Sequence, residues 1–350
     1  MARTPADVPS DEAPAVSAEP TSDARPAPDA YPALAAHPAP DAHPAPDAHP
    51  APNGHVAVFE AHRPRLFGLA YRLLGSASEA EDAVQDTYLR WDAADRAAIR
   101  IPAAWLTKVV TNLCLNQLTS ARVRRESYVG PWLPEPVLTD LGSGPLGPLE
   151  TAEQRESVSM ALLTLMERLT PSERAAFVLR EAFAYSHREV AETLGVQEAH
   201  ARQLHRRARQ HLGEPEPRRR FPVDGAQRTR IVQRFFAAAL DGDVAGLERL
   251  LAEDVVVWAD GAGEVTAARR PVTGRDKVLR YLLGLGRRPE AALMVTSFVE
   301  VNGGLGMAFR VGEGGPLVAV MAPEVVEAQV VAVHTIVAPG KLAFAAAQLA

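Results

Sequence analysis

The chain has 350 residues, of which 47% are hydrophobic, so it is long enough for two or three folded domains. Its formal net charge of −6 argues only superficially against a nucleic-acid partner, because residues 1–54 hold eight acidic and two basic residues and the remaining chain is neutral. The single cysteine, Cys114, excludes an internal disulfide and a cysteine-rich metal site. Without an apolar run of about 18 residues or an apolar signal core, we expect a cytoplasmic protein with no membrane span.

Residues 1–54 form a tail rich in proline, alanine and aspartate, in which HPAPDA begins at His37 and at His43 and HPAPNG begins at His49. Such a composition buries too little apolar surface to offset the entropy of ordering, so we predict a disordered segment. The spaced histidines would bind a metal only weakly, since a flexible tract does not preorganise its ligands. We therefore expect no metal site and no cofactor.

Residues 56–125 have the apolar spacing of an all-helical domain. Ser76 and Ser78 are each followed three residues later by a glutamate, which is the spacing of a capping box and marks the start of a helix. Pro102 opens a longer helix that ends in a basic cluster. The outward face of the helix that follows Ser76 carries Glu79, Glu81, Asp82, Gln85 and Asp86.

Residues 126–157 are a linker that contains the run YVGPWLPEP, from Tyr128 to Pro136. Its three prolines and its glycine exclude a regular helix there. A flexible spacer gains nothing from large aromatic groups. Tyr128 and Trp132 therefore indicate that this segment docks onto a folded domain.

Residues 158–212 contain two helix starts and a basic helix. Thr170–Glu173 and Ser186–Glu189 both have the capping-box pattern, and Gly195 suits the left-handed conformation that ends a helix. A short helix before a basic helix is the helix-turn-helix arrangement, whose second helix enters the DNA major groove. The alternative is a solvated arginine-rich helix in an ordinary bundle, but the caps, the turn and the segregated arginines together favour DNA binding. The polar face of the last helix carries His200, Arg202, Gln203, His205, Arg206, Arg207 and Arg209.

After a polar connector at residues 213–225 the composition changes. Residues 226–252 have the spacing of a helix pair, with a turn at Asp241–Asp243. Further on, glycine turns separate β-branched runs and predict antiparallel strands, so residues 226–350 read as an α+β domain. The runs are residues 255–258, 294–301, 317–321 and 325–336.

The helical segments are similar to a known family. RPRLFGLAYRLLGSASEAEDAVQDTYLRW (Arg63–Trp91) and AWLTKVVTNLCLNQLTSARVRRE (Ala104–Glu126) resemble region 2 of the extracytoplasmic-function sigma factors of bacterial RNA polymerase, and Thr170–Leu212 resembles region 4. YVGPWLPEP and the C-terminal domain resemble the SigJ-like subgroup. The resemblance implies two all-α sigma domains, at residues 56–125 and 158–212, followed by a cone-shaped α+β SnoaL-like domain.

The resemblance also implies a sigma factor that binds core RNA polymerase and directs promoter-specific initiation. The acidic face described above would meet the coiled-coil clamp of the β′ subunit, and region 4 would meet the β flap. The helix from Pro102 and the loop Asp95–Ile101 would hold the melted minus-ten strand, with a flipped base in a pocket beside that loop. The polar candidates for this contact are Lys108, Asn112, Gln117, Arg122, Arg124 and Arg125. Trp105 lies on the apolar stripe and is expected in the core rather than as a stacking platform.

Region 4 would read the minus-thirty-five element. Arginine can bind guanine bidentately and glutamine can bind adenine, while some side chains of such a helix reach only phosphate. The candidates are Gln197, Glu198, His200, Arg202, Gln203, Arg206 and Arg207. Gln197 stands where a capping serine is common, which weakens the start of this helix by about 1 kcal/mol.

For the C-terminal domain we favour the hypothesis of regulation in cis, in which the domain packs on both sigma regions and fixes their separation. The subgroup's DGGGK appears as Asp260–Glu264, with an acid in place of the lysine, and its NPDKL appears as Ala338–Leu342. The candidate regulatory residues are Trp132, Pro134, Asp260 and Lys341.

Three alternatives remain open at this point. They are a sensor of an unidentified small ligand, a DNA-binding repressor that acts without polymerase, and an enzyme. Fold does not imply function, so we expect no catalysis. The acid/base candidates of the enzyme alternative are Asp254, Asp260, Glu264 and His334.

Overall fold

The computed structural model describes residues 54–126, 128–139, 144–146, 152–213 and 224–350. All of these residues belong to one compact unit. The tail predicted as disordered, apart from Gly54, and most of the connector lie outside the described residues. Within the described ranges, no helix combines the length and the apolarity that crossing a bilayer requires.

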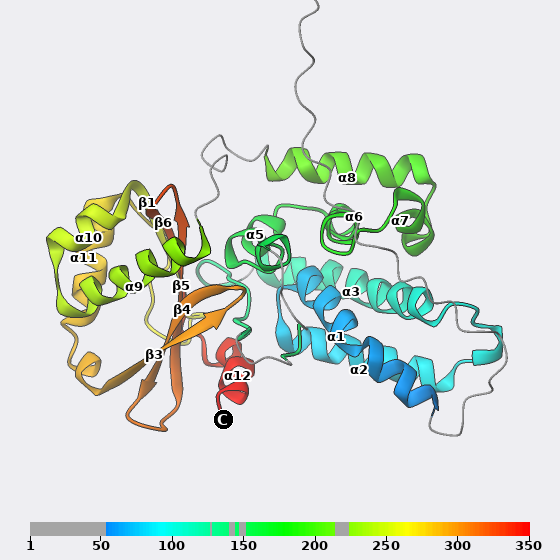
Figure 1. Ribbon diagram of the computed structural model, residues 1–350, viewed down its shortest axis with the longest axis horizontal. Coiled ribbons are helices and arrows are strands. Elements are labelled where there is room, and N and C mark those ends of the chain that lie inside the picture. The colour runs from blue at the N-terminus through cyan, green and yellow to red at the C-terminus, as the bar shows by residue number, and fades with distance from the viewer. Residues whose placement is uncertain (1–53, 127, 140–143, 147–151, 214–223) are drawn as a thin grey trace, which may run out of the picture. The chain divides into compact units, whose positions relative to one another are not determined.

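The first helical module contains three α-helices and a short 3-10 turn (Figure 1). Ser76 caps the second helix, because its hydroxyl accepts a hydrogen bond from the backbone N–H of Glu79 at 3.1 Å. Pro102 begins the third helix, as the sequence predicts. The elements are α1 (Gly54–Leu74), α2 (Ala77–Ala93), η1 (Arg96–Ala98) and α3 (Pro102–Glu126).

The second helical module has the predicted helix-turn-helix. Both capping boxes form, at Thr170 with Glu173 and at Ser186 with Glu189. Gly195 ends the short helix with a φ of 67°, and Gln197 makes no side-chain cap at the start of the basic helix. The module consists of α5 (Met160–Met166), α6 (Pro171–Glu181), α7 (His187–Leu194) and α8 (Glu198–Leu212), and α4 (Ala152–Glu156) precedes it.

The C-terminal domain combines helices with a six-stranded sheet of order β2-β1-β6-β5-β4-β3. Its helices are α9 (Gly225–Asp241), α10 (Val244–Leu250), α11 (Arg275–Gly286) and α12 (Pro339–Gln348), with a 3-10 turn η3 (Pro289–Leu293). Its strands are β1 (Leu251–Asp260), β2 (Val272–Thr273), β3 (Met294–Val301), β4 (Gly304–Val311), β5 (Leu317–Val326) and β6 (Gln329–Ile336).

The sheet corrects the expectation that all strands are antiparallel, because β1 pairs with β6 in parallel. A parallel pair needs a long crossover, which α11 and the strands β3 to β5 provide between β1 and β6. The run 325–336, predicted as one strand, is divided at Glu327–Ala328, whose φ angles of 49° and 66° form a tight hairpin turn. The sequence did not predict α11, α12, η3, β2 or β4, and the glycine-rich start of β4 reads as a turn.

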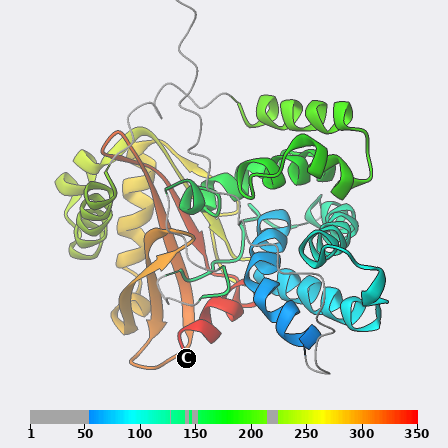
Figure 2. The same cartoon turned by 45° about the vertical axis from the view of Figure 1, so that its right-hand side comes forward.

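Two apolar cores cover opposite faces of this sheet. α9, α10 and α11 bury one face around Phe235 and Phe236. α12 packs on the other face, where the core also includes Leu133 and Leu138 of the linker segment (residues 128–139). Figures 1 and 2 both place α12 between the sheet and α1, where Phe344 stacks on Phe67 with ring centroids 5.7 Å apart.

The two helical modules share a single buried core, which includes residues from α1, α2 and α3 and from α5 to α8. The predicted fold class, two all-α modules followed by an α+β domain, is confirmed. The linker segment lies against both helical and sheet elements, so the described modules are packed together rather than spaced apart.

Candidate nucleic-acid interface and domain junction

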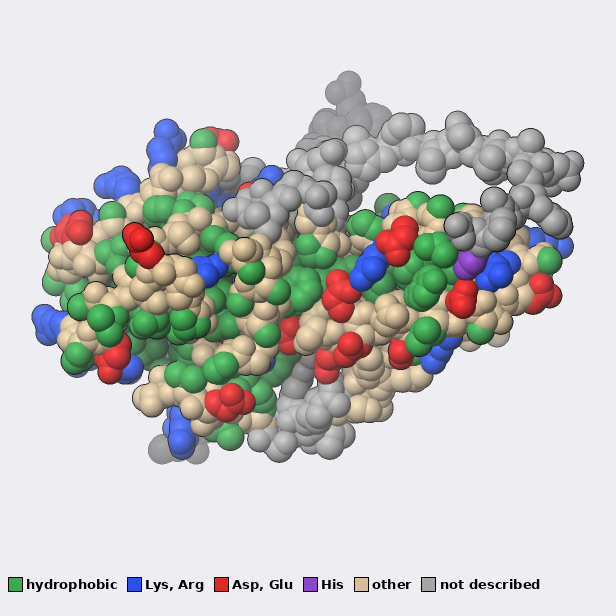
Figure 3. Space-filling model, turned by 90° about the horizontal axis from the view of Figure 1, so that it is seen from below, with side chains coloured by type: hydrophobic (Ala, Val, Ile, Leu, Met, Phe, Trp, Pro, Cys, Tyr) green, Lys and Arg blue, Asp and Glu red, His purple; other side chains and the backbone are tan. Residues whose placement is uncertain are grey.

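The outward face of α2 is acidic. The apolar residues of this helix are buried in the module core, which leaves its polar residues toward solvent. Asp82, Gln85 and Asp86 are exposed, and Glu79 and Glu81 are half-buried. Glu81 also accepts a hydrogen bond from the guanidinium of Arg63 at 2.9 Å. Seen from below, acidic side chains gather over the part of the protein where α1 and α2 lie (Figure 3).

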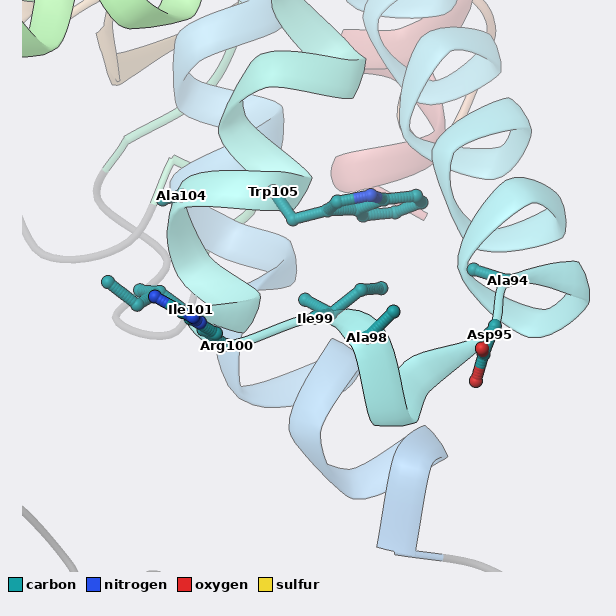
Figure 4. A pocket seen from close by; sticks show the side chains of 8 residues that line it. All are labelled: Ala94, Asp95, Ala98, Ile99, Arg100, Ile101, Ala104 and Trp105. Atoms are coloured by element: carbon teal, nitrogen blue, oxygen red, sulfur yellow. The ribbon is translucent and has the colours of Figure 1, made fainter.

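A pocket of about 520 Å³ opens beside the loop that precedes α3. Its walls are mostly apolar, and Trp105 at the start of α3 lies above Ile99 and Ala98 of the loop (Figure 4). Trp105 packs on Trp91 with ring centroids 5.7 Å apart, so it belongs to the edge of the core and to the pocket at once. The lining residues are Ala94, Asp95, Ala98, Ile99, Arg100, Ile101, Ala104 and Trp105.

The polar candidates on α3 do not form a single row. Lys108 and Asn112 are exposed and four residues apart, so they share a helix face next to the pocket. Gln117 is half-buried, and its Oε1 atom is buried without a hydrogen-bond partner among the described residues. Nine residues after Lys108, it lies on the opposite side of the helix. The side chains of Arg122, Arg124 and Arg125 lie outside the described residues.

The basic helix α8 buries only its apolar stripe of Ala201, Leu204 and Ala208. Glu198 is half-buried and forms an ion pair with Arg202 one turn later, so that arginine is partly neutralised. The remaining candidates stand free of the core on one continuous surface of the helix. Exposed there are Gln197, His200, Arg202, Gln203, Arg206 and Arg207.

His205 corrects the expectation that it belongs to the polar face of α8. Its side chain is only 11% exposed and its Nε2 lies 2.6 Å from a carboxylate oxygen of Glu181 in α6. The ring also packs near Phe177 and His187. The hydrogen bond from His205 lowers the pKa of Glu181, which keeps the carboxylate charged. His205 therefore joins α8 to α6 and is not available to DNA.

Asp260, at the end of β1, joins the C-terminal domain to the linker segment. Its carboxylate is fully buried and accepts hydrogen bonds from the Tyr128 hydroxyl at 2.6 Å, the Leu133 N–H at 2.8 Å and Lys341 Nζ at 2.7 Å. Burial, followed by the hydrogen bond to Asp260, raises the pKa of Tyr128, so its phenol stays a neutral donor. These hydrogen bonds hold the linker segment and α12 against the end of β1.

Lys341, near the start of α12, completes this junction. Its ammonium lies 4.2 Å from the ring centroid of Trp132 and 4.9 Å from that of Tyr128, within the range of cation–π attraction. Trp132, Asp260 and Lys341 are thus brought together, and Pro134 is buried in the same linker segment. Glu264, which stands where the subgroup has a lysine, is exposed.

The acid/base candidates occupy unlike environments. Asp254 and Glu264 are exposed, whereas the carboxylate of Asp260 is held by the linker and Lys341. The His334 ring is buried and stacks on Trp258 at 5.1 Å, and burial lowers its pKa to about 4. In the part of the chain that the structure describes, no three His, Cys, Asp or Glu side chains are grouped to hold a metal ion.

Glu135, which the sequence did not single out, caps α2 from the linker segment. Its buried carboxylate accepts hydrogen bonds from the backbone N–H groups of Ala77 and Ser78 at 2.9 and 3.0 Å and from the Ser76 hydroxyl at 2.8 Å. A carboxylate at a helix N-terminus is stabilised by the unpaired N–H groups and the helix dipole. The only local signal was a charged residue between two prolines of an otherwise apolar run.

The two helical modules contact each other directly. The Tyr185 hydroxyl, just before α7, donates a hydrogen bond to Thr107 of α3 at 3.1 Å. Arg174 of α6 is 2% exposed and donates to the backbone carbonyl of Arg72 in α1 at 3.3 Å. Arg65 of α1 lies over the rings of Phe183 and Tyr185. The helix-turn-helix is therefore held against α1 and α3.

Comparison with known protein families gives two matches. A family model described as "Sigma-70 region 2" matches residues 58–124. A second, described as "Sigma-70, region 4", matches residues 159–212. The first of these ranges contains α2, the pocket and most of α3, and the second contains the helix-turn-helix.

Among individual proteins, the chain is 42% identical over 269 residues to "ECF RNA polymerase sigma factor SigJ" of Mycobacterium tuberculosis, covering 74% of this chain and 82% of that protein. It is 30% identical to "Probable ECF RNA polymerase sigma factor SigI" of the same species, over 82% of this chain and 94% of that protein. The crystal structure of M. tuberculosis SigJ superposes with a TM-score of 0.66 at 38% identity, covering 83% of this chain and 98% of that one.

Proposed function

Because this chain belongs to the extracytoplasmic-function sigma factors, which direct RNA polymerase to promoters, we propose which of its surfaces perform each step of initiation. The acidic face of α2 docks on the coiled-coil clamp of the β′ subunit, and the second helical module also meets the β flap. α8 reads the minus-thirty-five element. The start of α3 and its pocket hold the melted minus-ten strand.

The acidic face of α2 supports docking because its carboxylates lie on a helix whose position is fixed by packing and by capping. Its apolar side is buried and its N-terminus is capped by Ser76 and Glu135. A rigid row of charges binds a complementary surface without first paying the entropy of ordering it. Asp82 and Asp86, four residues apart on one face, are the best placed of the group.

The pocket beside Asp95–Ile101 supports capture of a single unstacked base. Its volume of about 520 Å³ and its Trp105 and Ile99 walls suit a planar, largely apolar group. Exposed Lys108 and Asn112 on the adjoining face of α3 can follow the phosphate backbone of the same strand. Trp105, which the sequence predicted in the core, forms a wall of the pocket and also packs on Trp91 of the core.

The packing of the two helical modules supports control in cis. The minus-ten and minus-thirty-five elements are about 25 base pairs apart, which is roughly 85 Å of duplex at about 3.4 Å per base pair. Thr107, which precedes Lys108 on α3, accepts a hydrogen bond at 3.1 Å from the Tyr185 hydroxyl. Tyr185 directly precedes Ser186, the residue that caps α7. While the two helical modules pack together in this way, their DNA-reading surfaces cannot bind the minus-ten and minus-thirty-five elements at the same time. We call this packed state the closed arrangement. Opening it is a condition for initiation.

The C-terminal domain maintains the closed arrangement through the linker segment. The observation that carries this proposal is the buried Asp260 carboxylate, which binds Tyr128 and Leu133 of the linker and Lys341 of α12 together. The relatives are sigma factors, and the buried Asp260 carboxylate binds the linker segment and Lys341. We assign the domain a regulatory and not an enzymatic role.

The test is run-off transcription with purified core polymerase on genomic fragments. The full chain should select defined start sites, and Asp260→Asn should raise the output because it weakens the hold on the linker. Deletion of residues 226–350 provides a second, coarser release. Equal output from all three proteins would contradict control in cis, and no start-site selection by any of them would contradict the assigned surfaces.

A further inference from the structure

The turn between β3 and β4 is buried although its sequence is that of a surface hairpin. Asn302 and Gly303 occupy its two central positions with φ angles of 53° and 74°, as the Asn-Gly pair of a tight hairpin turn requires. Such a turn normally points into solvent. Asn302 is 2% exposed, because the tip of the hairpin is inserted between the linker segment and both helical modules.

Among the described residues, Asn302 makes four hydrogen bonds to partners outside its own domain. Its backbone N–H donates to the Val137 carbonyl at 2.9 Å, and its Oδ1 accepts from the Val137 N–H at 3.1 Å. Its Nδ2 donates to the Tyr71 hydroxyl of α1 at 2.6 Å and to the carbonyl of Val158, two residues before α5, at 2.7 Å. The Val137 N–H can only donate and the Val158 carbonyl can only accept, so these partners fix the orientation of the amide.

The contact continues from Asn302 to the start of α2. Tyr71, which accepts from Asn302, donates its own hydroxyl proton to the Glu135 carbonyl at 2.6 Å. Burial raises the pKa of Tyr71, so the phenol remains neutral and can serve as donor and acceptor together. Glu135 in turn caps α2 through Ala77 and Ser78. One hairpin of the C-terminal domain is thereby linked to the helix that carries the polymerase-docking face.

Gly303 brings the same turn against the beginning of the second module. Its N–H donates to the Thr139 hydroxyl at 3.1 Å. A Cβ at this position would lie 2.9 Å from backbone and side-chain atoms of Arg155 in α4, a distance that only glycine tolerates. Arg155 also forms an ion pair with Glu300 of β3 at 3.0 Å. The hairpin therefore fits closely on both sides of the junction.

We infer that Asn302 is a positioning residue for promoter recognition: it is the latch that ties the first helical module, the linker and the start of the second module to the C-terminal domain in the closed arrangement. This inference rests on the proposed control in cis and names the contact through which it acts. The hydrogen bonds described above from Asp260 and Lys341 join the C-terminal domain to the linker segment, whereas the single amide of Asn302 reaches all three. Separation of the two DNA-reading modules requires these bonds to break.

Two substitutions of Asn302 remove its side-chain amide and preserve the backbone conformation of the turn. Asn302→Asp tolerates the positive φ but removes both Nδ2 donors and sets a carboxylate against the Val158 carbonyl. Asn302→Gly keeps the turn conformation and removes the side chain without adding a charge. Tyr71→Phe removes the hydroxyl that accepts from Asn302 and leaves the ring in place. Glu327→Gly is the matched control, since it changes an exposed residue with a φ of 49° in another hairpin of the same domain.

The experiment measures the distance between spin labels on exposed positions of α3 and α8 in the full chain. Asn116→Cys and Gln210→Cys carry the labels, and Cys114 is buried and does not compete for them. Loss of a buried hydrogen bond is expected to shift the closed-to-open equilibrium about tenfold. Asn302→Asp and Asn302→Gly should lengthen the distance and raise run-off transcription, Tyr71→Phe should do so partly, and Glu327→Gly should do neither.

The outcomes distinguish the proposed role of Asn302 from the proposed control in cis. If Asn302→Asp and Asn302→Gly keep the parental distance while Asp260→Asn lengthens it, Asn302 is not the latch and control in cis stands. If the distance lengthens in any variant without a change in transcription, control in cis itself is wrong. Should Asn302→Asp fail to fold, Asn302→Gly and Tyr71→Phe decide the question. In the double variant Tyr71→Phe, Asn302→Gly the effects should be less than additive, because both substitutions remove the same bond.

Discussion

Glu135→Ala tests how the linker segment supports the proposed polymerase-docking helix. Glu135 is 8% exposed, and its carboxylate accepts hydrogen bonds from the backbone N–H groups of Ala77 and Ser78 at 2.9 and 3.0 Å. It also receives the hydroxyls of Ser76 and Ser78 at 2.8 and 3.0 Å. The substitution leaves two N–H groups at the first turn of α2 without their acceptor.

The size of the effect follows from those two donors. A buried donor left unsatisfied costs about 1–3 kcal/mol, so two donors give a range of about 2–6 kcal/mol. Ser78 is exposed, which lets water replace part of the carboxylate, and we expect a loss of about 2–4 kcal/mol in the free energy of unfolding. Glu135→Gln keeps an oxygen for the N–H groups and offers its NH₂ to the serine hydroxyls. It loses only the charge at the helix start, about 0.3–2 kcal/mol.

Urea unfolding followed by tryptophan fluorescence measures this difference, because Trp91 and Trp105 both lie in the first helical module. The midpoint should fall in the order parent, Glu135→Gln, Glu135→Ala, with an unchanged slope. Glu313→Gln, at an exposed position between β4 and β5, is the control and should stay within about 0.5 kcal/mol of the parent. A Glu135→Ala protein as stable as this control would refute the view that the linker segment holds the start of α2.

Three further substitutions test α8, the pocket beside α3 and the core of the C-terminal domain. Arg206→Ala on the exposed face of α8 should weaken promoter binding and reduce its salt slope by about one if Arg206 contacts phosphate, and unchanged affinity and slope would remove it from the interface. Trp105→Leu should weaken binding of a single-stranded minus-ten oligonucleotide by about 1–3 kcal/mol, measured by fluorescence anisotropy, and should leave duplex binding at α8 unchanged. Equal weakening of both kinds of binding would indicate a folding defect instead. Burial lowers the pKa of His334 from 6.5 to about 4, so the neutral imidazole contributes stability that is complete above pH 6.5 and is lost as the pH falls toward 4. As the pH falls from 6.5 to 4, the free energy of unfolding of the parent, measured with urea, should decrease by up to about 3 kcal/mol more than that of His334→Gln. Parallel pH profiles of the two proteins would contradict this.

The features that the sequence predicted well are those whose partners lie within one helical turn. The capping boxes at Thr170 and Ser186 and the turn at Gly195 depend on contacts three to five residues apart, and all three are present in the structure. The exposed row of α8 follows from the same short period, with His205 as the exception. His205 fails because Glu181, its partner, lies 24 residues earlier and leaves no trace in the local pattern.

The sheet and the junction show the opposite case. The parallel pairing of β1 with β6 and the strand β4 depend on which distant segment lies alongside, which periodicity does not encode. Glu135 caps a helix that begins 58 residues before it, and Asn302 binds Tyr71 across 231 positions. The sequence predicted a glycine turn after residues 294–301, and the structure has a turn at Asn302–Gly303, but nothing in the local pattern indicates that this turn is buried against another module.

The sequence by itself determined the helix-turn-helix with its caps, the starts of α2 and α3 and the family, because these depend on backbone capping, helical periodicity and local composition. Only the tertiary structure decided that the two DNA-reading modules share one core, that Glu135 of the linker segment caps α2, and that Asp260, Lys341 and Asn302 join the linker segment to the C-terminal domain. A buried polar group must be hydrogen-bonded, and each of these residues has a partner that only tertiary packing brings to it from a distant part of the sequence.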